Sequence, residues 1–177
     1  MLLYLMTTPT PVGDFHLISE HVTERRSEDL VYASGFGSLS DLLTRLPQAL
    51  RFGVFEKEQS THPYGALAEA YFRGDKHALE QIPVKQDGTE FYQRVWKAMS
   101  AVPYGQTASY KDLAQAVGSP NAVRAVGTTC GRNRLALLVP CHRVIRTDGS
   151  RGKYLYGDTI KNYLLDLEQR MAQPRGP

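Results

Sequence analysis

Residues 109–126 have the sequence SYKDLAQAVGSPNAVRAV, and this stretch decides the fold of the second half of the chain. Ser109 and Asp112 have capping-box spacing, in which each side chain bonds the backbone of the other residue across the first helical turn. Gly118 predicts the end of that helix, and Ser119-Pro120 predicts the N-cap and first residue of a second helix. Two short helices joined by a Gly-Ser turn are typical of a helix-turn-helix motif.

The apolar residues of this stretch predict which helix faces are buried. Leu113, Ala116 and Val117 form the expected stripe of the first helix, and the second helix carries Arg124 among the apolar residues Ala122, Val123, Ala125 and Val126. Two flanking helices are also predicted. Thr89 is the expected N-cap of a helix that carries Phe91, Val95, Trp96 and Met99 on one face. Asp158 is the expected cap of a last helix that includes Leu164, Leu165, Leu167 and Met171.

The first third of the chain has a different pattern. Up to about residue 60, short apolar runs alternate with Gly- and Ser-containing breaks, which predicts strands and turns. A helix is expected near Leu67–Phe72, and residues 82–88 have the composition of an extended linker. We therefore expect two domains, residues 1–85 and 86–177.

Charge is distributed unevenly along the chain. The net charge is +3, but residues 1–90 hold 8 basic and 13 acidic residues, whereas residues 91–177 hold 13 basic and 5 acidic ones. Such a basic half predicts a polyanionic partner. The basic residues within 119–153 are Arg124, Arg132, Arg134, Arg143, Arg146, Arg151 and Lys153, opposed only by Asp148.

Composition excludes several classes of protein. The hydrophobic fraction of 42% is ordinary for a globular protein, and no apolar run approaches the roughly 20 residues that span a bilayer. We expect a cytoplasmic protein without membrane contact. Two cysteines, Cys130 and Cys141, are too few for a disulfide scaffold or a four-cysteine zinc site, so we expect free thiols and no metal.

The motif Pro140-Cys-His-Arg-Val144 carries the chemistry. A thiol reacts as thiolate, and nearby histidine and arginine side chains favour that form. Pro140 biases the chain toward an extended conformation, in which Cys141 and His142 point to opposite sides. A water between thiol and imidazole is therefore expected, with Glu168 on the last helix as a candidate acceptor for the other ring nitrogen.

The chain resembles the O6-alkylguanine-DNA alkyltransferases, also called methylated-DNA–protein-cysteine methyltransferases. The matching segments come in the family's order across nearly all of residues 85–170, and before Gly65 the resemblance is faint. They are FYQRVW at 91–96, VPYGQTASY at 102–110, RAVG at 124–127, Asn133, PCHRV at 140–144, GKY at 152–154, and Lys161 through Glu168.

The resemblance implies an α/β two-domain fold, in which a small N-terminal domain has an antiparallel sheet and a mostly helical C-terminal domain has a winged helix-turn-helix. It implies that Cys141 accepts an alkyl group from O6 of guanine in a single, irreversible turnover. His142 and Glu168 would then take the thiol proton through a water, and Tyr110 would assist departure of the base. Asn133 would brace the helix-turn-helix against the active-site segment.

The resemblance also implies a partner, double-stranded DNA containing O6-alkylguanine, with no cofactor. The second helix would enter the minor groove, and Arg124 would fill the gap left by the flipped nucleotide. Activity on O4-alkylthymine and cooperative binding of an otherwise monomeric protein stay open. The expected DNA-binding residues are Ser119, Ala122, Arg124, Ala125, Tyr110, Arg132, Arg134 and Arg143, and the expected pocket residues are Val144, Gly152, Tyr154, Leu155 and Tyr156.

Two residues depart from the family pattern. Arg134 stands where proline is frequent, and we expect it to add charge toward the phosphates. Tyr156 stands where a small residue is frequent, which restricts the size of the alkyl group.

Three alternatives differ in class. A binding-only relative would lack the cysteine, whereas Cys141 is present. A regulatory relative would carry four zinc-binding cysteines in its N-terminal module, whereas residues 1–85 contain none. A Cys-His hydrolase would turn over repeatedly and would leave the helix-turn-helix and the basic half unexplained.

Overall fold

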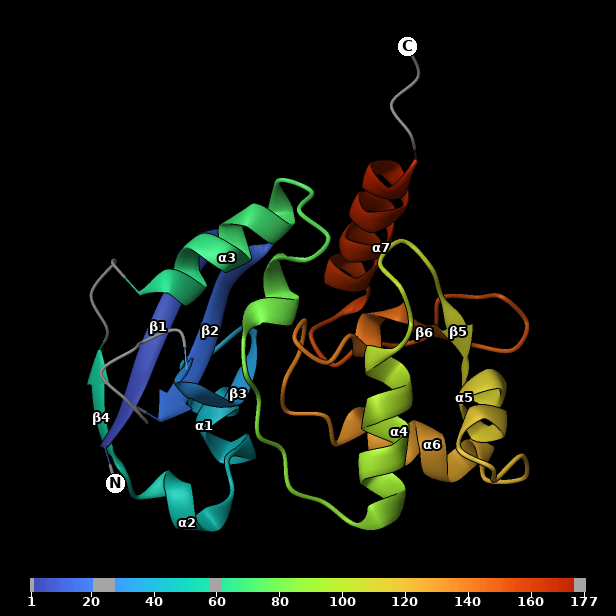
Figure 1. Cartoon of the computed structure of the whole chain (residues 1–177), viewed down its shortest axis with the longest axis horizontal. Coiled ribbons are helices and arrows are strands. Elements are labelled where there is room, and N and C mark those ends of the chain that lie inside the picture. The colour runs from blue at the N-terminus through green and yellow to red at the C-terminus, as the bar shows by residue number, and fades with distance from the viewer. Residues whose placement is uncertain (1, 21–27, 58–61, 174–177) are drawn as a thin grey trace. The chain divides into compact units, whose positions relative to one another are not determined.

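The computed structural model describes residues 2–20, 28–57 and 62–173. Its contacts divide the chain into two compact units (Figure 1). The first unit comprises residues up to Gln86 together with Arg134–Leu138, and the second comprises Asp87–Asn133 and the chain from Val139 onward.

The first unit is built on a four-stranded sheet with the order β3-β2-β1-β4. Its strands are β1 (Leu2–Thr10), β2 (Gly13–Glu20), β3 (Leu30–Phe36) and β4 (Val54–Lys57). The first three strands pair antiparallel, as the resemblance implied, and β4 joins β1 in parallel. A tight turn connects β1 to β2, and Gly13 at its end has a φ of 108°, which a side chain would disfavour.

Helices cover this sheet and complete its core. They are α1 (Leu39–Arg45), α2 (Gln48–Arg51) and α3 (Pro63–Phe72), followed by a 3-10 turn at Ala78–Gln81. Helix α3 contacts β1, and α1 contacts β3. One hydrophobic core cluster consists of Leu3, Ile18, Tyr32, Ala33, Leu42, Leu46 and Leu50.

A segment from late in the chain completes the first unit. Ser34 of β3 makes three hydrogen bonds with this segment. Its N–H donates to the Arg134 carbonyl, and its hydroxyl donates to the Ala136 carbonyl. Its own carbonyl accepts from the Ala136 N–H. The pairing stops there, because the chain turns at Leu137, which has a φ of 68°. This segment therefore pairs with β3 through a single bridge, between Ser34 and Leu135, and its residues Leu135, Ala136 and Leu137 are buried.

The second unit is mostly helical. Its helices are α4 (Glu90–Ser100), α5 (Tyr110–Ala116), α6 (Val123–Gly131) and α7 (Asp158–Ala172), and its parallel two-stranded sheet pairs β5 (Ala108–Ser109) with β6 (Val144–Ile145). Helices α4, α5 and α6 contact one another. Thr89 caps α4, and Ser109 and Asp112 form the expected capping box of α5. Gly118, with a φ of 72°, follows the end of α5.

Three local predictions were wrong. Helix α6 begins at Val123 with Ala122 as its N-cap, because the Ser119 carbonyl accepts from the Ala122 N–H and forms a turn first. On α5, Ala114 is buried and Ala116 is exposed. Asp158 is the first residue of α7, and its N-cap is Gly157, whose φ of 95° reverses the chain there.

Candidate active site

Cys141 lies at the start of a 3-10 turn, Cys141–Arg143, directly before β6. Its N–H donates to the Val139 carbonyl at 2.8 Å, and its side chain is half-buried. The expectation of an extended chain through the motif was wrong, because Pro140 has a ψ of 66° and begins the turn. The turn contacts α7, which supplies the groups behind the thiol.

The environment of the thiol contains opposing influences. Burial raises the pKa of Cys141, whereas a hydrogen bond with Asn133, the charge of Lys161 and a hydrogen bond with Tyr154 lower it. These three side chains come from the end of α6, from α7 and from the loop between β6 and α7. Burial prevails, so the pKa of the Cys141 thiol lies above its ordinary value although three neighbouring groups favour the anion.

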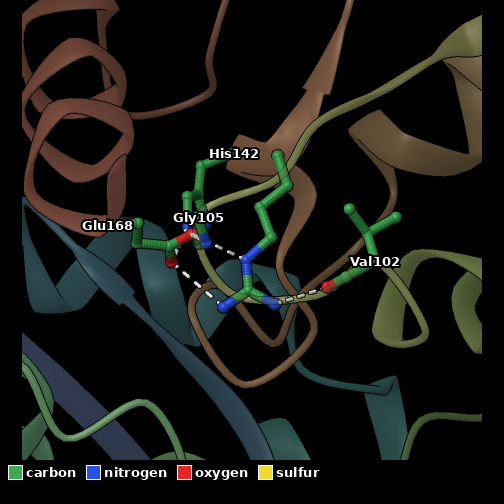
Figure 2. Close-up of polar contacts among 5 residues, drawn as sticks. Val102, Gly105, His142 and Glu168 are labelled. Atoms are coloured by element: carbon green, nitrogen blue, oxygen red, sulfur yellow. Dashed lines mark hydrogen bonds and ion pairs between the residues drawn. The ribbon is translucent and has the colours of Figure 1, made fainter. Parts of the chain in front are cut away.

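Behind the thiol, the carboxylate of Glu168 collects four hydrogen bonds (Figure 2). His142 Nε2 donates to Oε1 at 2.8 Å, and the Gly105 N–H donates to Oε2 at 3.1 Å. Arg143 donates through Nε and Nη2 at 2.9 and 3.0 Å, while its Nη1 donates to the Val102 carbonyl at 2.7 Å. The carboxylate is thus held as an anion between an imidazole and a guanidinium.

These bonds determine the protonation of the pair. Burial works against the Glu168 anion, yet the His142 and Arg143 bonds and charges outweigh burial and lower the pKa of Glu168 to about 2. Burial lowers the pKa of His142, although Glu168 opposes this effect. The neutral imidazole therefore carries its proton on Nε2, and its buried Nδ1 has no hydrogen-bond partner among the residues described. Nδ1 is available to accept a proton.

Gly105 is required where the chain passes α7. Its φ is 78°, and a Cβ there would lie 2.4 Å from the Ala172 Cβ and 3.0 Å from the Glu168 carbonyl oxygen. Only glycine brings its N–H to the carboxylate without a clash.

Asn133 and Tyr110 connect the helix pair to the thiol. Asn133 is buried, and its Nδ2 donates to the Val139 carbonyl at 2.8 Å, two residues before Cys141. Tyr110 is the first residue of α5 and is half-buried. Its pKa is raised by burial and by the nearby thiols of Cys130 and Cys141.

The expected DNA-binding residues divide into two groups. Arg124, Ala125 and Arg132 are exposed, and Ser119 and Ala122 are half-exposed. The DNA contacts expected of Arg143 and Arg134 stay predictions, and both side chains also bond within the protein. Arg143 donates hydrogen bonds to the Glu168 carboxylate and to the Val102 carbonyl. Arg134 donates through Nε to the Tyr32 carbonyl at 3.1 Å within the first unit.

The expected pocket residues lie around the loop between β6 and α7. Val144 is buried on β6, and Gly152 has a φ of 68°. Tyr154 and Tyr156 are half-buried, and their rings meet edge to face with centroids 5.6 Å apart. Leu155 between them is 49% exposed. The Tyr156 ring thus packs directly on Tyr154, the side chain that helps to lower the pKa of the Cys141 thiol.

Sequence reasoning missed the position of Lys161. This lysine is 1% exposed, and its Nζ donates to the Val144 carbonyl at 2.7 Å and to the Lys153 carbonyl at 3.5 Å. Burial lowers its pKa, and the nearby thiols oppose this effect. The spacing of Lys161 with Leu164, Leu165 and Glu168 places it on the inner face of α7, which was the available signal.

The described residues contain no group of three or more His, Cys, Asp or Glu side chains arranged to hold a metal ion. Within the same ranges, no helix is both long enough and apolar enough to cross a membrane.

Comparison with known proteins defines the class. Residues 90–170 match the family described as "6-O-methylguanine DNA methyltransferase, DNA binding domain". The chain is 41% identical over 128 residues to the inducible methylated-DNA–protein-cysteine methyltransferase of Bacillus subtilis, covering 72% of this chain and 69% of that protein. It is 45% identical over 101 residues to the enzyme of Methanosarcina barkeri, covering 57% of this chain and 63% of the relative.

A solved structure agrees over most of the chain. The Mycobacterium tuberculosis OGT, crystallised in complex with DNA, matches with a TM-score of 0.74 and 30% identity, covering 96% of this chain and 94% of that one. Fold, site and sequence together define a DNA-binding repair methyltransferase. The chain belongs to the methylated-DNA–protein-cysteine methyltransferase family.

Proposed function

We propose that this protein repairs DNA by transferring an alkyl group from O6 of guanine to Cys141. The observation that carries this proposal is the arrangement of Cys141 beside His142, whose Nε2 is held by Glu168 while Nδ1 can accept a proton. The family supports the substrate, and the DNA complex of the M. tuberculosis relative supports the partner.

The reaction balances with groups on this chain. The thiol proton passes through a water molecule to His142 Nδ1, and Glu168 stabilises the resulting imidazolium without accepting the proton, since the pKa of Glu168 is about 2. The sulfur attacks the alkyl carbon, so that an S–C bond forms as the C–O6 bond breaks. Guanine leaves as its anion and receives a proton from the Tyr110 hydroxyl. The thioether is not hydrolysed, so each molecule acts once.

Duplex DNA requires an additional step. An alkylated base cannot be reached inside the stack, and flipping it out costs a few kcal/mol. We assign α6 to the minor groove and Arg124 to the vacated space, because Arg124 is exposed in the first turn of α6 and its planar cation can stack on bases.

Several finer properties belong to the same proposal. The protein acts as a monomer without a cofactor in the cytoplasm, and residues 1–85 support a catalytic and DNA-binding domain at 86–177. The proposal does not include action on O4-alkylthymine or cooperative binding to DNA.

Intact mass measurement tests the proposal. Incubation with a duplex containing O6-methylguanine should add one methyl group per protein molecule, and peptide mapping should locate it on Cys141. Cys141→Ser should abolish transfer and keep DNA binding, whereas Cys130→Ser serves as the matched thiol control and should still transfer. More than one turnover per molecule, or a methyl group on Cys130, would contradict the proposal.

A further inference from the structure

Arg151 forms a surface strap between the pocket loop and α7. Its Nη1 donates to both the backbone carbonyl and the Oδ1 of Asn162 at 3.2 Å, and its Nη2 pairs with the Asp166 carboxylate. Asn162 and Asp166 are one helical turn apart, so they present adjacent acceptors on one face of α7. The hydrogen bond and charge of Arg151 also lower the pKa of Asp166.

The strap holds the loop close to its reactive part. Arg151 precedes Tyr154 by three residues, a chain length of at most about 10 Å. Between them, the Lys153 carbonyl accepts from Lys161, whose side chain lies on the inner face of the same helix. The loop is therefore fixed to α7 at two points, one exposed and one buried.

The loop between β6 and α7 carries Tyr154 and Tyr156, two of the expected pocket residues. Tyr156 packs edge to face on Tyr154, with ring centroids 5.6 Å apart, and Tyr154 is near enough to Cys141 to lower the pKa of its thiol. A displacement of the loop would move both rings relative to the sulfur. The bonds from Arg151 to α7 oppose such a displacement on the solvent side.

We propose that the strap of Arg151, Asn162 and Asp166 is a positioning device that sets which alkyl groups reach Cys141. This inference rests on the proposed function. The strap holds the two tyrosine rings closed over the sulfur, which suits a methyl group and hinders a benzyl group. Arg151 thus acts through the loop, although its place among the basic residues at 119–153 suggests a phosphate contact.

Free-base substrates separate these two roles, since O6-methylguanine and O6-benzylguanine as free bases carry no phosphate. Arg151→Ala should slow methyl transfer and raise the benzyl-to-methyl ratio of second-order rate constants by roughly twofold to fivefold, the range open to an exposed pair. Asp166→Ala should do the same. The double variant should match either single variant, because both remove one interaction.

Lys97→Ala is the control, since it removes an exposed positive charge from α4 and leaves the bonds among Arg151, Asn162 and Asp166 intact; its ratio should equal that of the wild type. Equal thermal stability of all variants would separate positioning from general loosening. If the wild type transfers methyl groups but Arg151→Ala has an unchanged benzyl-to-methyl ratio, the proposed role of the strap is wrong. Additive effects of the two substitutions in the double variant would also contradict it. Absence of wild-type transfer to Cys141 would instead overturn the proposed function.

Discussion

At the scale of single residues, Glu168 decides the electrostatics of the site. It is 1% exposed and balances the Arg143 guanidinium, so replacing it leaves a buried cation without its partner. We predict that Glu168→Gln lowers the free energy of unfolding at pH 7 by about 3 kcal/mol. Urea denaturation measures this loss. Glu69→Gln, which breaks the exposed pair with Arg73, should cost less than about 1 kcal/mol.

The same residue predicts a pH dependence. The folded-state pKa of about 2 lies below the ordinary value of 4.5, so the unfolded state binds the proton more readily. The stabilisation by Glu168 is therefore fully present above pH 4.5 and is lost as the pH falls toward 2. The difference in unfolding free energy between wild type and Glu168→Gln should shrink across this window. A constant difference would refute the assignment.

Tyr156 also acts as a single residue. Its ring packs on Tyr154, which lies near enough to Cys141 to lower the pKa of the thiol, so we expect a bulky alkyl group to compete with the Tyr156 ring for space. Overpacking costs about 1–3 kcal/mol, and we predict that Tyr156→Gly raises the rate of benzyl transfer by roughly one to two powers of ten with little change in methyl transfer. Rate constants for both free bases in both proteins measure this. Equal acceleration of both substrates would argue against occlusion.

At the scale of elements, two serines that look alike in the sequence have different roles. Ser109 accepts from the Asp112 N–H at 3.1 Å and donates to its carboxylate at 2.7 Å, whereas Ser119 uses its backbone carbonyl, which alanine retains. We predict that Ser109→Ala costs about 1 kcal/mol of unfolding free energy and that Ser119→Ala costs less than about 0.5 kcal/mol. Urea denaturation of both variants compares them. Similar losses would mean that Ser119 caps α6 after all.

Helix α6 gives a second prediction at this scale. If Arg124 stabilises only the flipped state, Arg124→Ala should slow repair of duplex DNA by tenfold or more, about 1.4 kcal/mol, and leave reaction with free O6-methylguanine unchanged. Single-turnover rates on both substrates provide the test. Arg170→Ala, which removes an exposed arginine from another helix, is the control. Parallel losses on duplex and free base would show that Arg124 supports the chemistry instead.

At the scale of the whole molecule, the charge asymmetry predicts how DNA binding responds to salt. The basic half should release counterions from the phosphates, so the logarithm of the affinity should fall linearly with the logarithm of salt concentration. Arg143 and Arg134 are engaged within the protein, and we expect their charge to contribute little to this slope. Titrations of unmodified duplex at several salt concentrations give the slope. An affinity independent of salt would contradict binding led by phosphates.

The sequence by itself determined where α4 and α5 begin and which contiguous residues form the Pro-Cys-His-Arg-Val motif. The cap at Thr89 and the capping box at Ser109 were predictable because their bonds join residues within one helical turn. The Pro-Cys-His-Arg-Val motif indicated the proposed nucleophile and its neighbours because its residues are contiguous. Ser119 misled the prediction of α6, since cap-forming residues also form turns and the sequence does not say which.

Only the tertiary structure decided which charges are free to meet DNA. Arg143 and Arg134 belong to the basic half in the sequence, yet Arg143 pairs with Glu168, 25 residues away, and Arg134 bonds the Tyr32 carbonyl, 102 residues away. Lys161 is a surface residue by type and is buried between two carbonyl groups. Such contacts depend on which segments the folded chain brings together. A local sequence pattern predicts hydrogen bonds between residues a few positions apart. It does not predict partners that are 25 or 102 residues apart in the chain.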